Sequence, residues 1–197
     1  AGQAGARVVI ATERPVCWLR PVIEAGFTGT AVCMNGAVVY DVAAGTVLSS
    51  TVLEPPVMQG FVDDLDLLSL EYALAVERVG TSMEDFWAEP AYVHPWDDGE
   101  YRRVTRPELL AGPVAKLLVR YGRQSGALLE AARAVSRDRV AVTYSSDDGL
   151  IEVAAAGVTK GAALSVLAEG WGIDRADVVA FGDMPNDLEM LQWAGRS

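Results

Sequence analysis

One short stretch decides the fold of this chain, Phe181-Gly182-Asp183-Met184-Pro185-Asn186-Asp187. The apolar run before it predicts a buried strand over residues 177–181, and apolar residues at helical spacing follow from Leu188 onward. In open α/β sheets, ligands bind at the carboxyl ends of the strands. Asp183 and Asp187 would stand there as oxygen ligands for a hard cation such as Mg2+. An Asx turn followed by a capped helix explains the same residues without a ligand, and this segment alone does not separate the two interpretations.

Composition limits the possible classes of protein. The 197 residues, 51% of them apolar and 22% charged, are enough for one large domain or two small ones. A net charge of −11 would repel a phosphate backbone, so nucleic acid is not an expected partner. No apolar run reaches the roughly 18 residues of a membrane span, so no membrane partner is expected. Cys17 and Cys33 fit a reduced, cytoplasmic setting, and the single histidine, His94, gives no support to a cysteine and histidine metal site.

Two further strands are predicted to end in polar residues. The runs 7–12 and 30–34 are short and continuously apolar, which is typical of strands buried on both faces. Thr12-Glu13-Arg14 follows the first run, and Asn35-Gly36 follows the second. A hairpin over 38–48 and a helix over 158–170, with Lys160 near its start, complete this part of the chain. In a doubly wound sheet the ends of these strands lie along one edge, so we expect the polar residues to meet.

The middle of the chain has a different pattern. Residues 57–154 predict an inserted α+β unit with helices near 58–70 and 126–136 and strands near 115–121, 139–144 and 150–153. Phe61, Leu65 and Leu68 fit one face of the first helix, so we expect Asp64-Leu65-Asp66 to be part of this helix. Trp87, His94 and Trp96 would fill a small core or form an aromatic platform for a substrate. Turn chemistry explains two acidic loops better than metal binding does: Asp97-Asp98-Gly99 and Asp147-Asp148-Gly149.

Four motifs in this order resemble the haloacid dehalogenase (HAD) superfamily, and more narrowly its Cof-type sugar-phosphatase branch. Gly182 to Asp187 is similar to the acidic motif of that family, and Val158-Thr159-Lys160-Gly161 to the segment that carries its lysine. Ile10 to Pro15 resembles its threonine motif, and Asn35-Gly36-Ala37 resembles a loop of this branch. The resemblance spans nearly the whole chain and implies a Rossmann-like core with an inserted α+β cap.

The resemblance also implies roles for single residues. Thr12 would hydrogen-bond a phosphate oxygen, Lys160 would neutralise the phosphate, and Asp183 would bind Mg2+. Asp187 would contribute to the metal site directly or through water. In such phosphatases an aspartate attacks phosphorus, and water then cleaves the aspartyl-phosphate. The substrate side would be lined by four residues: Arg14, Asn35, Gly36 and Asn186.

Two departures from the family pattern matter. Glu13 stands where the family usually has glycine, and its negative charge would weaken phosphate binding or alter specificity. The nucleophile motif of the family, Asp-x-Asp-Gly-Thr, belongs to a strand that would precede Ala1. We therefore expect this chain to be part of a longer polypeptide. Without that strand, the strands 7–12 and 177–181 would face a gap, and unpaired backbone groups buried there are costly.

These observations lead to one main hypothesis and two alternatives. The main one is a Mg2+-dependent phosphatase for a small phosphorylated metabolite, such as a sugar phosphate. In this hypothesis the chain has an incomplete doubly wound core over 1–56 and 155–197 and a cap domain over 57–154. The alternatives are a catalytically inactive relative that binds a ligand or a partner, and a phosphotransferase or mutase on the same scaffold. The sequence leaves the substrate and the oligomeric state open.

Overall fold

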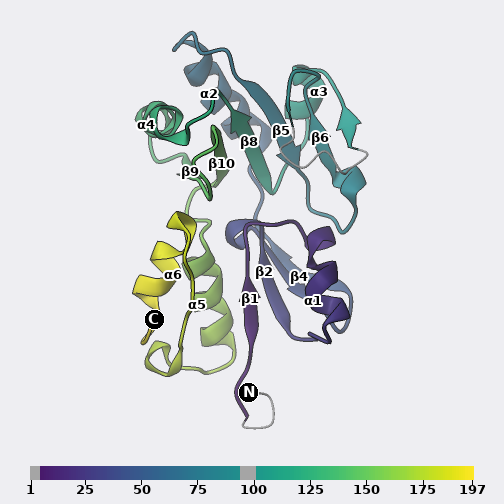
Figure 1. Cartoon of the computed structure of the whole chain (residues 1–197), viewed down its shortest axis with the longest axis vertical. Coiled ribbons are helices and arrows are strands. Elements are labelled where there is room, and N and C mark those ends of the chain that lie inside the picture. The colour runs from purple at the N-terminus through teal and green to yellow at the C-terminus, as the bar shows by residue number, and fades with distance from the viewer. Residues whose placement is uncertain (1–4, 94–100) are drawn as a thin grey trace. The chain divides into compact units, whose positions relative to one another are not determined.

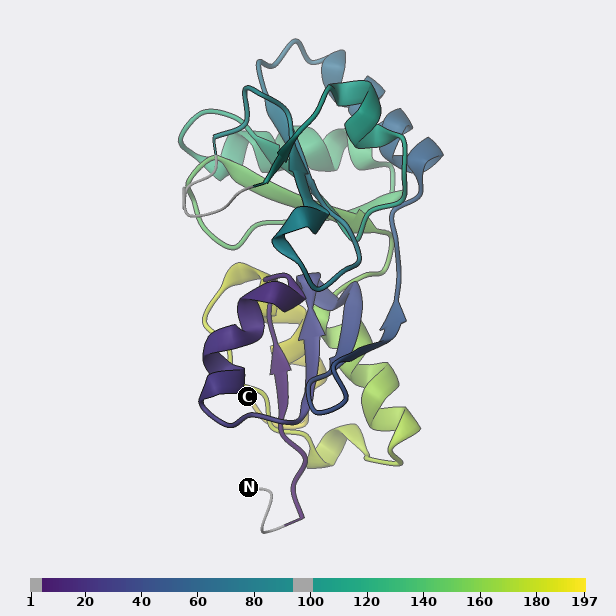
Figure 2. The same cartoon turned by 90° about the vertical axis from the view of Figure 1, so that its right-hand side faces the viewer.

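The computed structural model describes residues 5–93 and 101–197. The chain folds into two compact units (Figures 1 and 2). The split unit consists of Ala1–Thr51 and Val158–Ser197, and the inserted unit is Val52–Gly157. The expectations for His94, Trp96 and the loop Asp97-Asp98-Gly99 lie outside the described residues. No helix in the described ranges has the length and apolar character needed to cross a membrane.

The split unit contains a four-stranded sheet in the order β1-β2-β3-β4. Its strands are β1 (Val9–Ala11), β2 (Thr30–Cys33), β3 (Val38–Asp41) and β4 (Thr46–Ser50). β1 and β2 are parallel, and the crossover between them contains the 3-10 helix Val16–Leu19 and α1 (Arg20–Glu24). β3 pairs antiparallel with β2 and with β4, which confirms the hairpin predicted over 38–48. The β1-α1-β2 crossover is the parallel element of the predicted α/β core.

The prediction of a strand over 177–181 is wrong, because this segment belongs to neither sheet. Only Val179 forms a bridge there, a parallel one with Arg196. Two apolar side chains of this segment are also exposed, Val179 at 52% and Phe181 at 85%, while Ala180 is buried. The expectation that residues 7–12 are buried on both faces is wrong too, because β1 is only half-buried and occupies an edge of its sheet. An apolar run becomes a strand only beside a partner strand, and within the described residues this segment pairs only through the single bridge to Arg196.

Two helices of the second half pack side by side (Figure 1). α5 (Lys160–Gly170) begins at Thr159, whose Oγ1 accepts a hydrogen bond from the Ala162 N–H at 3.1 Å. α6 (Leu188–Trp193) follows directly on the 3-10 helix Pro185–Asp187. A small core joins α6 to the chain before it and to β1 through four apolar side chains: Ala180, Met190, Ala194 and Ala11. This core anchors the turn that carries the acidic motif.

The inserted unit has a six-stranded sheet in the order β7-β6-β5-β8-β10-β9. All its pairings are antiparallel except β6 with β7. The predicted strands correspond to β8 (Lys116–Arg120), β9 (Val140–Thr143) and β10 (Leu150–Ala155). Four elements were not predicted: β5 (Ala73–Glu77), β6 (Phe86–Ala88), β7 (Arg102–Arg103) and α3 (Arg106–Leu110). They are five residues or shorter, which is too short for hydrophobic periodicity to identify them.

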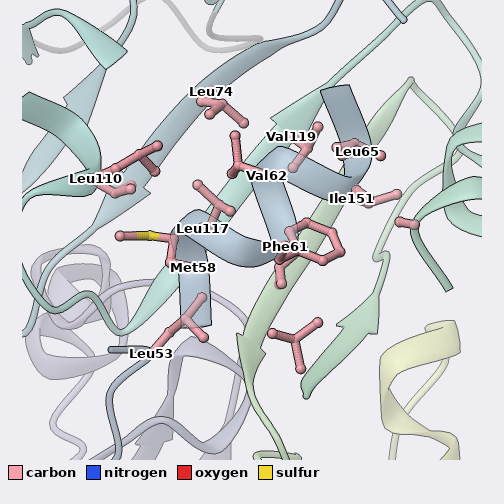
Figure 3. Close-up of a cluster of buried hydrophobic side chains, with 14 of the residues drawn as sticks. Leu53, Met58, Phe61, Val62, Leu65, Leu74, Leu110, Leu117, Val119 and Ile151 are labelled. Carbon is pink, nitrogen blue, oxygen red and sulfur yellow. The ribbon is translucent and has the colours of Figure 1, made fainter. Parts of the chain in front are cut away.

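The core of the inserted unit lies between its sheet and its helices (Figure 3). α2 (Pro55–Asp66) contributes four fully buried side chains at helical spacing: Met58, Phe61, Val62 and Leu65. α4 (Ser125–Ser136) adds Leu128 and Ala132 to the same cluster. Asp64-Leu65-Asp66 therefore belongs to a packed helix, as predicted, with the Asp64 carboxylate paired to Arg139.

Candidate functional site

The loops after β1 and β2 are tied together by backbone hydrogen bonds. The Asn35 N–H donates to the Thr12 carbonyl at 3.1 Å, and the Met34 N–H donates to the Arg14 carbonyl at 3.1 Å. The Thr12 N–H itself donates to the Val32 carbonyl at 2.8 Å. Parallel strands end at the same edge of a sheet, so this pairing places the two predicted polar clusters next to each other. The prediction that these strand ends meet is confirmed.

A pair of asparagines connects these loops to the acidic motif. The Asn186 Nδ2 donates to the Asn35 Oδ1 at 3.1 Å, across 151 positions of sequence. Asn35 is buried and adopts a left-handed backbone conformation (φ 58°, ψ 22°), which asparagine tolerates better than most residues. The other amide atom of Asn186, Oδ1, is buried and has no hydrogen-bond partner within the described residues. A buried acceptor of this kind suits a donor or a cation supplied by a ligand.

Lys160 and Asp187 form the most buried ion pair of the split unit. The Lys160 Nζ donates to the Asp187 Oδ1 at 2.7 Å, and the two side chains are 2% and 8% exposed. Lys160 is the first residue of α5, where both the helix dipole and burial disfavour a cation. A second carboxylate lies close by, with the Glu13 Oε2 3.8 Å from the Lys160 Nζ. The two carboxylates offset these unfavourable terms and hold a buried positive charge at the ends of the strands.

Asp187 also organises its own turn. Its Oδ2 accepts hydrogen bonds from the backbone N–H groups of Asp183 and Met184, each at 3.2 Å. Gly182 makes this possible, because a Cβ at that position would lie 2.6 Å from the Asp187 Cβ. Both oxygens of Asp187 are therefore engaged within the protein. This arrangement favours Asp187 as an anchor for Lys160 and for the turn over Asp187 as a direct metal ligand.

Gly36 has a packing role that the sequence did not reveal. Its φ is +103°, and a Cβ there would lie 2.3 Å from the Thr159 carbonyl oxygen, at the start of α5. Only glycine lets the loop after β2 approach the N-terminus of α5 this closely. The close approach is sufficient to explain why glycine stands at this position.

The oxygen donors fit a magnesium ion in part. The Asp183 carboxylate is exposed and makes no ion pair or hydrogen bond within residues 5–93 and 101–197. Those same ranges hold no cluster of three or more metal-binding side chains. Mg2+ commonly takes one or two carboxylates and keeps several waters, so Asp183 and the unsatisfied Asn186 Oδ1, which belong to the same acidic motif, are suitable though incomplete ligands.

The charges of the site favour a cation over a free anion. Three carboxylates, those of Glu13, Asp183 and Asp187, stand against the two cations Lys160 and Arg14. A phosphate group would meet this net negative charge unless a metal ion came with it. The oxygen donors and the net negative charge therefore both favour a metal cation at this site.

Arg14 and Thr12 complete the set of predicted site residues. The Thr12 Oγ1 accepts a hydrogen bond from the Arg14 N–H at 3.2 Å. The Arg14 guanidinium lies 5.8 Å from the Trp18 ring centre, and its Nε is 3.7 Å from the Glu13 Oε1. Sequence reasoning treated Glu13 only as a departure from a motif, and it overlooked that Glu13 contacts both cations of the site. The one signal in the sequence is its position between Thr12 and Arg14.

The profile of the haloacid dehalogenase-like hydrolase family matches residues 1–197, and the chain belongs to this family. The resemblance drawn from the four motifs is thereby confirmed. Among solved structures, the chain is similar to the HAD subclass IIB sugar phosphatase BT4131, with a TM-score of 0.79 and 16% identity. That similarity covers 98% of this chain and 74% of BT4131, and it confirms the Rossmann-like α/β fold class.

Short segments are similar to curated relatives. A segment of 58 residues is 43% identical to the 5-amino-6-(5-phospho-D-ribitylamino)uracil phosphatase YbjI of Escherichia coli, covering 29% of this chain and 21% of that protein. An alignment of 46 residues shows 52% identity to the HMP-PP phosphatase of Cronobacter sakazakii, covering 23% of this chain and 17% of the relative. The aligned segments thus span about a fifth of the length of these curated relatives.

Proposed function

We propose that this chain forms most of a Mg2+-dependent phosphatase that hydrolyses a small phosphorylated metabolite, such as a sugar phosphate. The observation that carries the proposal is the buried Lys160, held 2.7 Å from Asp187 where the loops after β1 and β2 meet the acidic motif. A buried cation at the ends of the strands suits a site where a phosphate binds together with a metal ion. The relatives' printed names support the class of substrate, because each names a phosphatase. They name different substrates, so the proposal stops at the class.

Each site residue has a role in this proposal. Thr12 donates its hydroxyl to a phosphate oxygen, and Lys160 neutralises the phosphate charge. Asp183 holds Mg2+, and Asp187 acts on the metal through water, since both its oxygens are engaged. When bound, Mg2+ neutralises charge on the phosphoryl group. Four residues line the substrate side: Arg14, Asn35, Gly36 and Asn186.

The nucleophile in this proposal is an aspartate on a strand that precedes residue 1 in the polypeptide. Its carboxylate attacks phosphorus, the alcohol leaves, and water then cleaves the aspartyl-phosphate to release inorganic phosphate. Within the described residues, β1 pairs on one side, with β2, and the segment around Val179 pairs on one side, with Arg196. This supports the proposal, because a further strand between them would satisfy the remaining backbone groups of both. Asp64 and Asp66 are unsuited to the role, since they belong to the packed helix α2.

The inserted unit acts as the cap in this proposal. Its role is to select the leaving group, while the split unit holds the phosphate. The setting we propose is the reduced cytosol, which the low cysteine content supports, since the chain has two cysteines, Cys17 and Cys33.

The test is the release of inorganic phosphate by the protein made from its complete reading frame. A panel of sugar and nucleotide-precursor phosphates is assayed with Mg2+, and the variant Asp183→Asn is compared with the exposed control Asp177→Asn. We expect Asp183→Asn to abolish phosphate release and the control to retain it. Full activity in Asp183→Asn, or no release from any substrate by the parent protein, would refute the proposal.

One observation favours a second function. The Glu13 carboxylate, 3.8 Å from the Lys160 Nζ, suits a catalytically inactive relative that binds a ligand or partner, because it opposes a phosphate there. A reading frame without an upstream Asp-x-Asp would favour that alternative. Transfer of the phosphoryl group to a second metabolite, in place of release into water, would identify a phosphotransferase or mutase.

A further inference from the structure

Two carboxylates bind Lys160 in different ways. The Asp187 Oδ1 is 2.7 Å from the Lys160 Nζ, within hydrogen-bonding distance, and both side chains are buried. The Glu13 Oε2 is 3.8 Å from the same nitrogen, beyond hydrogen-bonding distance, and the Glu13 side chain is 29% exposed. Asp187 is therefore the hydrogen-bonded partner of Lys160, and Glu13 is a more distant partner whose side chain is partly exposed to solvent.

Glu13 lies between the two cations of the site. Its Oε1 is 3.7 Å from the Arg14 Nε, while its Oε2 faces Lys160. Lys160 and Arg14 are the two cations that would receive a phosphate group. A carboxylate and a phosphate both offer oxygens with negative charge, so they compete for the same two cations.

We propose that Glu13 is an internal anion that occupies the phosphate position on Lys160 and Arg14 and must be displaced when a phosphate binds. The proposal rests on the proposed function of this site. Displacing Glu13 weakens the binding of substrate and of inorganic phosphate by similar factors. It therefore raises KM and speeds release of the product, and it leaves kcat nearly unchanged when hydrolysis is limited by the chemical step.

The size of the effect follows from the distance and the exposure of Glu13. For a unit charge 3.8 Å from Lys160 and screened by water, removing the charge tightens phosphate binding about fivefold. Glutamine has nearly the same shape as glutamate, so Glu13→Gln changes the charge and little else. Glu24→Gln is the matched control, because Glu24 also pairs with an arginine, Arg20, and is exposed.

The experiment measures inorganic phosphate binding by isothermal titration calorimetry with Mg2+ present, using the protein from its complete reading frame. Steady-state kinetics on the same samples gives KM, kcat and product inhibition. We expect Glu13→Gln to bind phosphate about fivefold more tightly, to lower KM by a similar factor and to keep kcat within about twofold. Glu13→Ala should shift phosphate binding in the same direction, and Glu24→Gln should match the parent protein.

The outcomes separate this inference from the proposed function. Unchanged or weaker phosphate binding in both Glu13 variants would overturn the inference, whatever the activity. A loss of kcat with no gain in phosphate affinity would also overturn it, because it would assign Glu13 a role in the chemical step or in the structure. Tighter phosphate binding in a protein that hydrolyses no substrate would support the inference and refute the proposed phosphatase.

Discussion

Replacing Asp187 with asparagine tests the centre of the site. The substitution keeps the shape of the side chain and removes its charge. One amide atom can still accept from the N–H groups of Asp183 and Met184, which now donate to the Asp187 Oδ2 at 3.2 Å. The amide NH2 then faces the Lys160 Nζ at the position of the present 2.7 Å hydrogen bond, so a donor opposes a donor.

The cost follows from the burial of Lys160. Its side chain is 2% exposed, and the partner that remains is Glu13 at 3.8 Å. Breaking a buried ion pair by removing one partner typically costs about 3–5 kcal/mol of folding free energy. Because Glu13 still offsets part of the charge, we expect Asp187→Asn to lower the free energy of unfolding by about 3 kcal/mol.

A double-mutant cycle isolates the pair. Lys160→Met removes the buried charge and leaves Asp187 with its two backbone donors, so the double variant no longer buries an unpaired cation. We expect the double variant to be more stable than Asp187→Asn alone, with a coupling free energy of at least about 1 kcal/mol. Urea denaturation followed by circular dichroism, without added metal, measures all four proteins.

Two results would refute this reasoning. A loss of less than about 1 kcal/mol in Asp187→Asn would show that Lys160 is not buried as an ion pair. Additive effects of the two substitutions would show that Lys160 and Asp187 contribute to stability independently.

Three further outcomes are expected. Lys116 lies 3.0 Å from Glu77 and 3.4 Å from Glu152, all buried, so Lys116→Met should lower the free energy of unfolding by about 3–5 kcal/mol in urea titrations. Burial raises the pKa of Tyr92 from 10.0 to about 12, so its stabilising contribution is full below pH 10 and is lost as the pH rises through 12. Between pH 10 and pH 12, urea titrations should show that the parent protein loses about 2 kcal/mol more unfolding free energy than Tyr92→Phe loses. An equal loss in the two proteins would contradict this prediction. Chelation by EDTA should abolish phosphate release, and Mg2+ should restore it.

Local patterns were sufficient for much of the split unit. The apolar run 30–34 became β2, and the turn residues after 41 closed the predicted hairpin between β3 and β4. These features depend on residues that are neighbours in the sequence, so a single sequence is enough to predict them. The same reason explains the helical assignment of Asp64-Leu65-Asp66, where Leu65 continues the apolar spacing of α2.

The strand predictions failed where strand formation depends on pairing with segments that are distant in the sequence. The run 177–181 is as apolar as 30–34, yet β2 has two neighbouring strands and Val179 has a single bridge. β5 lies in the middle of the sheet of the inserted unit and was overlooked, because five buried residues without alternation carry no period. Strand formation depends on backbone partners, and a sequence pattern does not display them.

By itself, the sequence determined the family of this protein, its α/β class and the residue types gathered at the ends of its strands, because motifs and periods are local properties. Only the tertiary structure decided how those residues pair. It buried Lys160 against Asp187, placed Glu13 on the same cation, and joined Asn35 to Asn186. Contacts of this kind depend on distance and burial after folding, which residues far apart in the chain acquire only when their strands and helices pack.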